Sequence, residues 1–309
     1  MRTLFARLQY LLPHHLLCRI VYALTRSRVP WLKNGLIGAF TRAYRPRMSD
    51  ALLSEPSSYA SFNAFFTREL QPGARPIDPD PRRVVSPCDG TLSIASNVQA
   101  DRMLQAKGHE FTLQGLLADE KPWAQALRGG LYATLYLAPF NYHRVHMPLA
   151  GRLRAAWHVP GRLFSVNRAT VERVPGLFAR NERVVCAFDG EHGPFVVVLV
   201  GALFVGSIST VWHGEVTPWR DGGARRGGDT RSGTLAGGTL AAAIHPLEPD
   251  PGSTADLWQP RGAQLGFFNM GSTVLLLLPA GLARWDDTLQ PGASIAVGQS
   301  LGSLLAPRA

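Results

Sequence analysis

The first 48 residues show apolar side chains every three or four positions, the spacing of a helix with one apolar face. Pro13, Pro30 and Pro46 interrupt this pattern. Proline is tolerated at a helix start but not in a helix interior. The pattern therefore predicts short amphipathic helices that are separated by these prolines. Their apolar positions are Leu4, Leu8, Leu11, Leu12, Leu16, Leu17, Ile20, Val21, Leu24, Leu32, Leu36, Ile37 and Phe40.

From Val84 onward the chain consists of short apolar runs separated by Gly, Pro and Asp, a pattern typical of strands. The run at 195–208 is shorter than the roughly 18–20 residues of a membrane-spanning helix and contains glycines, so it predicts buried strands. Residues 221–238 are rich in Gly, Arg and Thr and predict a long loop. Strands are predicted at 131–137, 183–188, 195–200, 204–211 and 274–278, with strand, turn and strand over 294–302.

These patterns predict an α+β fold that is mainly β, with a mixed β-barrel or sandwich core and N-terminal amphipathic helices. We expect a helical region at 1–70 and a β-rich catalytic region at 71–309. Cys18, Cys88 and Cys186 are widely spaced and odd in number, which fits neither a disulfide framework nor a zinc site. No cleavable signal peptide is expected, since charged residues and a proline interrupt the N-terminal apolar stretch.

The formal net charge is +10 and the pI about 10.1, which favours anionic partners. Residues 1–48 hold nine Arg and Lys and no Asp or Glu. Such helices can lie on an anionic bilayer, where each basic residue contributes about 1 kcal/mol of attraction. Ordinary packing against the core is the alternative. The candidate membrane-docking residues are Arg2, Arg7, Arg19, Arg26, Arg28 and Lys33.

Gly271 and Ser272 precede the predicted strand at 274–278. The Ser272 hydroxyl can attack the Gly271 carbonyl through a five-membered ring, because the two groups are tethered. The amide is more stable than the ester, so the fold must supply strain, a base and oxyanion donors. β-Elimination of the ester gives dehydroalanine, and hydrolysis then gives a pyruvoyl group. A simple turn is the alternative for this tripeptide.

His143 and His146 lie between two prolines, just after a predicted strand. On a regular strand they face opposite sides, so a bend after Asn141 is needed for both to converge. They are candidates for general acid and base near neutral pH. A metal site is disfavoured, because no matching Cys, Asp or Glu cluster accompanies them. A polar strand end is the alternative.

Asp89 lies in the turn Ser-Pro-Cys-Asp-Gly, and in such turns an aspartate usually caps its own loop. Its functional interpretation is a carboxylate that takes a proton from Ser272 or orients a histidine.

In combination, these motifs resemble the prokaryotic-type phosphatidylserine decarboxylases, pyruvoyl enzymes of phospholipid synthesis. The His-Arg-Val-His and Asn-Glu-Arg blocks are the most specific matches. Met270 stands where the family usually has Leu, and Cys88 where a small residue is common. The matching segments, in order, are 65–70, 86–90, 107–108, 142–148, 178–184, 205–208 and 271–273.

The resemblance implies self-cleavage between Gly271 and Ser272 into a β chain (1–271) and an α chain (272–309), which stay together. Asp89, His146 and Ser272 match the self-cleavage relay, and His143 matches the histidine of substrate handling and decarboxylation. Ser272 becomes the covalent pyruvoyl cofactor, which forms a Schiff base with the substrate. Neither pyridoxal phosphate nor a metal is implied.

The resemblance further implies decarboxylation of phosphatidylserine to phosphatidylethanolamine at the cytoplasmic face of the inner membrane. It implies a peripheral protein that contacts an anionic bilayer, forms a homodimer and binds no nucleic acid. Two alternatives are an uncleaved lipid-binding module and a serine hydrolase that uses Ser272, His146 and Asp89. A third is a pyruvoyl decarboxylase of a soluble amino acid, which has little need for residues 1–48.

Overall fold

The computed structural model describes residues 8–118, 120–204, 207–216, 231–233, 242–248 and 257–306. Arg2 and Arg7 lie outside the described residues, as does the predicted loop 221–238 except for 231–233, which form a strand. Positions 205–206 of the predicted strand 204–211 also lie outside them.

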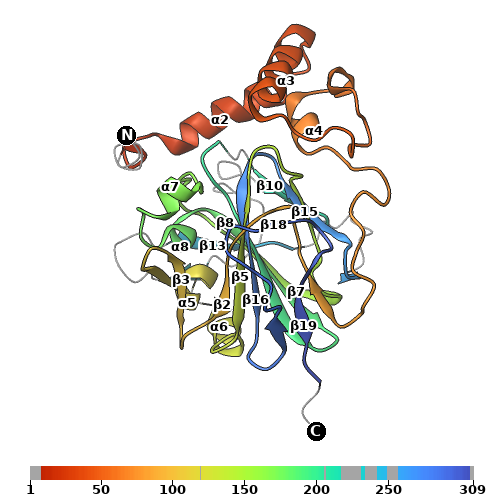
Figure 1. The fold of residues 1–309 in the computed structure, drawn as a ribbon. Coiled ribbons are helices and arrows are strands. Elements are labelled where there is room, and N and C mark those ends of the chain that lie inside the picture. The colour runs from red at the N-terminus through yellow and green to blue at the C-terminus, as the bar shows by residue number, and fades with distance from the viewer. Residues whose placement is uncertain are drawn as a thin grey trace.

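The predicted helices after Pro13 and Pro30 are confirmed, whereas most of the one predicted before Pro13 lies outside the described residues. Helix α2 (His14–Thr25) begins directly after Pro13, and helix α3 (Pro30–Tyr44) begins at Pro30. A 3-10 turn, η1 (Pro56–Ser58), and a short helix, α4 (Phe62–Phe66), follow. Figure 1 shows these helices gathered at one end of the β-rich body. In the described part of the chain, no helix is both long and apolar enough to cross a membrane.

Aromatic side chains join α3 to α4 in a small core of their own. Phe40 meets Phe62 edge to face, with ring centroids 5.3 Å apart, and also contacts Phe65 and Phe66. Ring pairs of this geometry add to the stabilisation from buried area. Met270 packs against the same cluster. The helical region therefore reaches the segment that precedes Gly271.

The described β strands are antiparallel wherever they pair, and short helices connect several of them. The strands are β1 (Arg83–Val85), β2 (Gly90–Asn97), β3 (Arg102–Ala106), β4 (His109–Thr112), β5 (Leu131–Leu137), β6 (Arg144–His146), β7 (Gly151–Val159), β8 (Arg183–Gly190), β9 (Gly193–Val200), β10 (Ile208–Thr210), β11 (Gly214–Val216), β12 (Arg231–Gly233), β13 (Ala242–Pro246), β14 (Trp258–Gln259), β15 (Gln264–Phe268), β16 (Ser272–Leu278), β17 (Ala283–Trp285), β18 (Ser294–Ile295) and β19 (Ser300–Leu304). The helices are α5 (Leu113–Leu117), α6 (Lys121–Ala126), α7 (Arg168–Val171) and α8 (Leu177–Arg180).

One large sheet organises the molecule. Its strand order is β12-β13-β7-β8-β9-β16-β5-β2-β18, with β14 paired to β7. The α+β, mainly β class is confirmed, and of the two predicted cores, barrel or sandwich, the described strands form no closed barrel. Two small sheets, β11-β10-β15-β6 and β1-β19-β17, share one apolar core with this sheet. The other face packs against residues of α5 to α8 and the β3–β4 hairpin.

Strand β16 lies in the middle of the large sheet. It pairs with β5 from Ser272 opposite Leu137 to Leu278 opposite Leu131, and with β9 on its other side. All seven of its residues are buried. Burial on both faces explains the uninterrupted apolar run, because neither face needs polar residues for water. Residues 272–278 are therefore held in place by their neighbours on both sides.

A cavity in this strand should weaken the fold strongly. Leu276→Ala removes a fully buried side chain from the middle of β16 and should lower the free energy of unfolding by about 2–5 kcal/mol. Leu16→Ala, at a side chain that is 56% exposed, should change it by less than about 0.5 kcal/mol. Denaturant unfolding of both variants checks this. Equal effects at the two positions would contradict the buried central position of β16.

Candidate active site

The predicted bend between β5 and β6 is present. The Asn141 amide donates to the Ala138 carbonyl (2.9 Å), and the Asn141 side chain accepts from the Ala138 amide (2.8 Å). The chain then enters β6 at Arg144. His143 and His146 nevertheless contact different neighbours: His143 stacks on Phe66 and His146 lies beside Tyr142. The bend thus gives each histidine its own environment.

His143 is completely buried, with its ring centroid 4.1 Å from that of Phe66. Its Nδ1 lies 2.9 Å from the Asn141 carbonyl, which can only accept, so Nδ1 carries the proton. Burial, with a smaller contribution from the nearby Arg68 charge, lowers the pKa of His143 to about 3, although the hydrogen bond to the Asn141 carbonyl opposes this. The ring is therefore neutral at pH 7. Its basic Nε2 has no hydrogen-bond partner among the described residues.

Gly271 lies directly against this free nitrogen. A Cβ at Gly271 would stand 3.8 Å from His143 Nε2 and 3.8 Å from the Leu137 carbonyl oxygen. Ser272, the first residue of β16, is fully buried, and its Oγ has no partner in the described part of the structure. A free imidazole nitrogen and a free hydroxyl therefore lie at the Gly271–Ser272 segment.

Asn269 holds the chain just before this segment. Its Nδ2 donates to the Ser207 Oγ (2.7 Å) and the Ser209 Oγ (3.2 Å). Its Oδ1 accepts from the Asn63 side chain of α4 (3.0 Å). These bonds fasten the approach to Gly271 both to β10 and to the helical region, although the sequence pattern drew no attention to Asn269.

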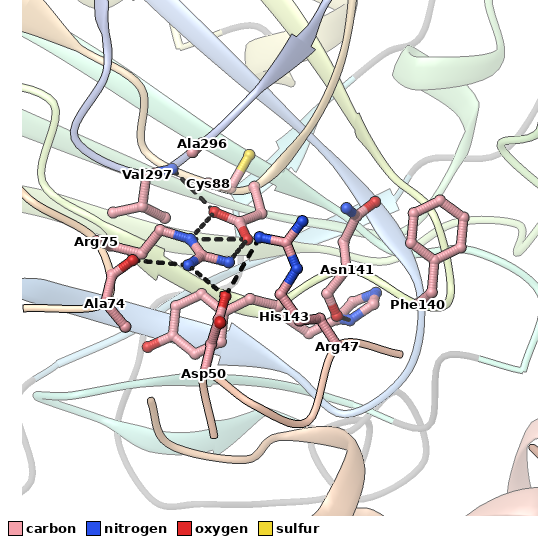
Figure 2. Close-up of polar contacts among 12 residues, drawn as sticks. Arg47, Asp50, Ala74, Arg75, Cys88, Phe140, Asn141, His143, Ala296 and Val297 are labelled. Carbon is pink, nitrogen blue, oxygen red and sulfur yellow. Dashed lines mark hydrogen bonds and ion pairs between the residues drawn. The ribbon is translucent and has the colours of Figure 1, made fainter. Parts of the chain in front are cut away.

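Asp89 is bound by Arg75 rather than by a histidine (Figure 2). The Arg75 Nε lies 2.9 and 3.0 Å from the two carboxylate oxygens, its Nη2 lies 2.6 Å from one of them, and the Val297 amide donates at 2.9 Å. Arg75 also pairs with Asp50 at 3.0 Å. The hydrogen bonds that Arg75 donates to both carboxylates raise the pKa of Arg75 above its usual value. The sequence motifs did not predict a role for Arg75, because it lies in a proline-rich stretch that predicts only a loop.

Gly298 places the Val297 amide against Asp89. Its φ is +82°, and a Cβ there would lie 2.6 Å from the Pro76 carbonyl oxygen. Only glycine allows both this left-handed conformation and this close approach. Through its hydrogen bond with the Val297 amide, Asp89 links residues 1–271 to residues 272–309.

His146 has both ring nitrogens occupied. Its Nδ1 donates to the Gly262 carbonyl (2.8 Å), so its Nε2 accepts from the Tyr142 hydroxyl (3.1 Å). Burial lowers the pKa of His146, although the Asp89 charge opposes this. Among the described residues, no hydrogen bond links Asp89, His146 and Ser272 to one another. The residue beside Gly271 is His143.

The other motif residues have structural contacts. The buried Arg183 donates to four backbone carbonyls, and the Asn181 side chain bonds Phe164 and Gly201. Lys107 and Gly108, both with positive φ, make the turn between β3 and β4. The described residues contain no group of three or more His, Cys, Asp or Glu able to hold a metal ion.

Comparison with known proteins identifies the family. A family model described as phosphatidylserine decarboxylase matches residues 62–303, and a second, described as PSD, matches residues 4–45. The chain therefore belongs to the phosphatidylserine decarboxylase family, a class of carboxy-lyases. It is 49% identical to the phosphatidylserine decarboxylase proenzyme of Azotobacter vinelandii, over 97% of each chain. It is 47% identical to that of Methylococcus capsulatus, over 97% of this chain and 96% of the relative. The motif resemblance is confirmed.

The buried histidine predicts a pH dependence of stability. The ordinary pKa of 6.5 falls to about 3 in the folded chain, so between these values the unfolded chain binds a proton that the folded chain does not. The free energy of unfolding should therefore fall as pH drops below about 6.5 and level off near pH 3. From pH 7 to 5, His143 should account for about 2 kcal/mol of the loss.

This dependence is measured by denaturant unfolding at pH 7 and pH 5, with Ser272→Ala present throughout so that one intact chain is compared. Adding His143→Gln should remove this part of the pH dependence, whereas His15→Gln, at an exposed residue, should preserve it. A full wild-type dependence in the His143→Gln variant would contradict the neutral, buried state of His143.

Proposed function

We propose that this chain cleaves its own Gly271–Ser272 bond, converts Ser272 to a pyruvoyl group and decarboxylates phosphatidylserine to phosphatidylethanolamine. One observation carries the proposal: Ser272 Oγ and His143 Nε2 are both buried at this peptide, and neither has a hydrogen-bond partner among the described residues. Leaving a buried polar group unpaired costs about 1–3 kcal/mol. Two such groups at one peptide bond support a chemical role. The names of the proenzyme relatives support the same reaction.

In the proposed self-cleavage, the Ser272 oxygen attacks the Gly271 carbonyl and the amide becomes an ester. Elimination releases the carboxylate of Gly271, and water then replaces the nitrogen of residue 272, which leaves as ammonia. We assign Asp89 and His146 to proton transfer in this stage, as the family resemblance implies. Their occupied hydrogen bonds, to Arg75 and Tyr142, must exchange partners for this to happen.

The residues present suit a pyruvoyl group at position 272. The site is buried, the strand behind it is paired on both sides, and a neutral base with a free nitrogen stands beside it. A pyruvoyl group supplies a ketone that takes up an amine and accepts the electrons released as carbon dioxide leaves. The free Nε2 of His143 would take up the proton that the substrate amine gives up and would deliver it to the carbon that loses carbon dioxide. Burial by Phe66 limits the access of water.

The two products of cleavage should remain one particle. Residues 273–277 are hydrogen-bonded partners of β9, and 272–278 are partners of β5, all within 1–271. The Val297 amide also bonds Asp89 across the two chains. The α chain (272–309) is thus a central part of the sheet.

Changing Ser272 tests the proposal. Ser272→Ala should leave one uncleaved chain and abolish the release of carbon dioxide from phosphatidylserine vesicles, because no pyruvoyl group can form. Ser294→Ala, at an exposed serine of the same segment, should cleave and decarboxylate normally. A denaturing gel shows whether each variant is cleaved, and a carbon dioxide assay measures its decarboxylation of phosphatidylserine. Decarboxylation that survives in Ser272→Ala would overturn the proposal.

The same samples separate the two alternatives. An uncleaved lipid-binding module would give one intact chain in the wild type and release no carbon dioxide. A serine hydrolase would also stay uncleaved but would react covalently with a fluorophosphonate at Ser272.

We further propose that the helical region docks on the cytoplasmic face of the cell membrane as a peripheral anchor. Helix α2 turns an apolar stripe outward: Leu16, Ile20 and Leu24 are 56%, 50% and 43% exposed. Its buried side instead carries His14 and Cys18. This is the reverse of a helix that packs its apolar face on a core, and it suits a helix on a bilayer.

The described basic residues that are candidates for membrane docking fall into an exposed group and a group with partners in the protein. Arg19 and Arg28 are exposed and free to meet anionic lipid. Arg26 instead pairs with Glu215, and Lys33 donates to the Ser57 carbonyl (2.8 Å). Trp31, two residues before Lys33 on α3, is 76% exposed and adds to the exposed apolar surface.

Vesicle flotation tests the docking surface. Leu16→Ser, Ile20→Ser and Leu24→Ser together should weaken binding to phosphatidylserine-containing vesicles at least about tenfold, since each loses burial worth roughly 1 kcal/mol or more. Self-cleavage should continue, because these side chains face away from the β body. The control is a triple change at exposed polar residues of the same region, Asn34, Ser49 and Ser57 to Ala. Unchanged flotation of the serine variant would contradict the assignment.

A further inference from the structure

A cavity of about 960 Å³ opens beside the helical region, next to the site. Its lining includes Arg45, Arg47 and Arg68 together with Asp89 and Tyr142. Arg45 and Arg47 follow directly on α3, the helix that carries the exposed Trp31, and both are exposed. The cavity therefore extends from the end of α3 to the residues around Asp89.

Arg68 is a buried cation for which the described residues supply no carboxylate. It is 3% exposed, and its Nη2 lies 3.2 Å from the Phe140 carbonyl oxygen and 3.5 Å from that of Asn141. Its Nε and Nη1 have no partner within the described ranges. The nearby carboxylates Asp89 and Asp50 are both bound to Arg75 (Figure 2).

An unpaired buried guanidinium is costly, because it gives up hydration and receives no anion in exchange. Burial accordingly lowers the pKa of Arg68 below its usual value. The guanidinium is a planar fork in which the free Nε and Nη1 lie on different edges, each beside Nη2, so each can donate a charge-assisted hydrogen bond to an oxygen of an anion. The arrangement suits an anion that arrives from outside the chain.

Arg68 is close to the proposed reaction site. Its Nη2 and His143 Nδ1 approach the same acceptor, the Asn141 carbonyl, at 3.5 and 2.9 Å. The opposite nitrogen of His143 faces Gly271. Arg68 is thus connected to the Gly271–Ser272 peptide through the Asn141 carbonyl and the His143 ring. In a phosphoserine headgroup, only a short link separates the phosphate from the amine.

We propose that Arg68 binds the phosphodiester of the phospholipid substrate, an inference that rests on the function proposed above. The substrate also carries a carboxylate, but that group loses its charge as carbon dioxide leaves. A guanidinium on it would stabilise the reactant more than the transition state and slow the reaction. The phosphodiester keeps its charge throughout, so binding it positions the headgroup without that penalty. Arg45 and Arg47 lie along the same cavity and draw the headgroup inward.

Steady-state kinetics of the cleaved enzyme tests this role. Arg68→Gln should self-cleave as the wild type does and should raise KM for a short-chain phosphatidylserine at least about tenfold, with a much smaller change in kcat. Arg68→Lys, which keeps the charge but not the fork, should raise KM by less. Arg82→Gln, at an arginine that donates to the Leu304 carbonyl outside the cavity, is the control and should match the wild type. A wild type that fails to cleave would instead refute the proposed function, so the two failures are distinguishable.

Soluble probes identify the group that is bound. Glycerophosphoethanolamine carries the phosphodiester but no carboxylate, and free serine carries the carboxylate but no phosphate. Inhibition by glycerophosphoethanolamine should weaken at least about tenfold in Arg68→Gln, while any inhibition by serine should not change. Loss of serine inhibition alone would overturn the assignment in favour of the carboxylate. An unchanged KM, or failure of both variants to self-cleave, would make Arg68 a structural residue and also overturn it.

Discussion

The pairing of β16 on both sides is the constraint on which the rest of the structure depends. All seven of its residues are buried; they pair with β5 along the whole strand and with β9 at 273–277. Ser272 is the first of them and pairs with Leu137 of β5, so the residue that bears the reacting hydroxyl begins a strand that is paired on both sides from its next residue onward. Breaking the chain just before this residue would remove no strand pairing. The proposed cleavage can therefore create a new chain end inside the protein without unfolding it.

Around this strand, some buried polar groups have hydrogen-bond or ion-pair partners and others have none. Arg75 forms ion pairs with Asp50 and Asp89, and Tyr142 forms a hydrogen bond with His146. His143 Nε2, Ser272 Oγ and two nitrogens of Arg68 have no such partners among the described residues. The unsatisfied groups lie along one path, since Arg68 and His143 meet at the Asn141 carbonyl and His143 meets Gly271. This path is where a reaction and an anionic headgroup would compensate for missing hydrogen bonds.

Local patterns predicted the elements well because local chemistry determines them. Helices begin at or directly after Pro13 and Pro30, and the apolar run at 131–137 coincides with β5. The strand predicted at 274–278 begins two residues earlier, since Ser272 and Thr273 are polar yet pair with β5. The sequence left barrel and sandwich open because strand order depends on contacts between distant segments, which periodicity does not encode.

The candidate site was predictable only in part, for a similar reason. Ser272, His143, His146 and Asp89 stood out because their residue types suit the chemistry. Arg75 did not, since it meets Asp89 by folding of a proline-rich segment with no pattern of its own. The neutral state of His143 follows from burial under Phe66, which sequence spacing cannot show. The outward apolar stripe of α2 could be recognised as a stripe, but its direction required the fold.

The central claim is that Ser272 is a precursor of the cofactor and not a working hydroxyl. Intact mass spectrometry of the purified wild-type protein under denaturing conditions tests it most directly. Self-cleavage with pyruvoyl formation predicts two masses, residues 1–271 and residues 272–309, the second lighter by one ammonia than the same segment with an N-terminal serine. A single mass for the uncleaved chain, or a second fragment that retains its serine, would show that Ser272 is not converted.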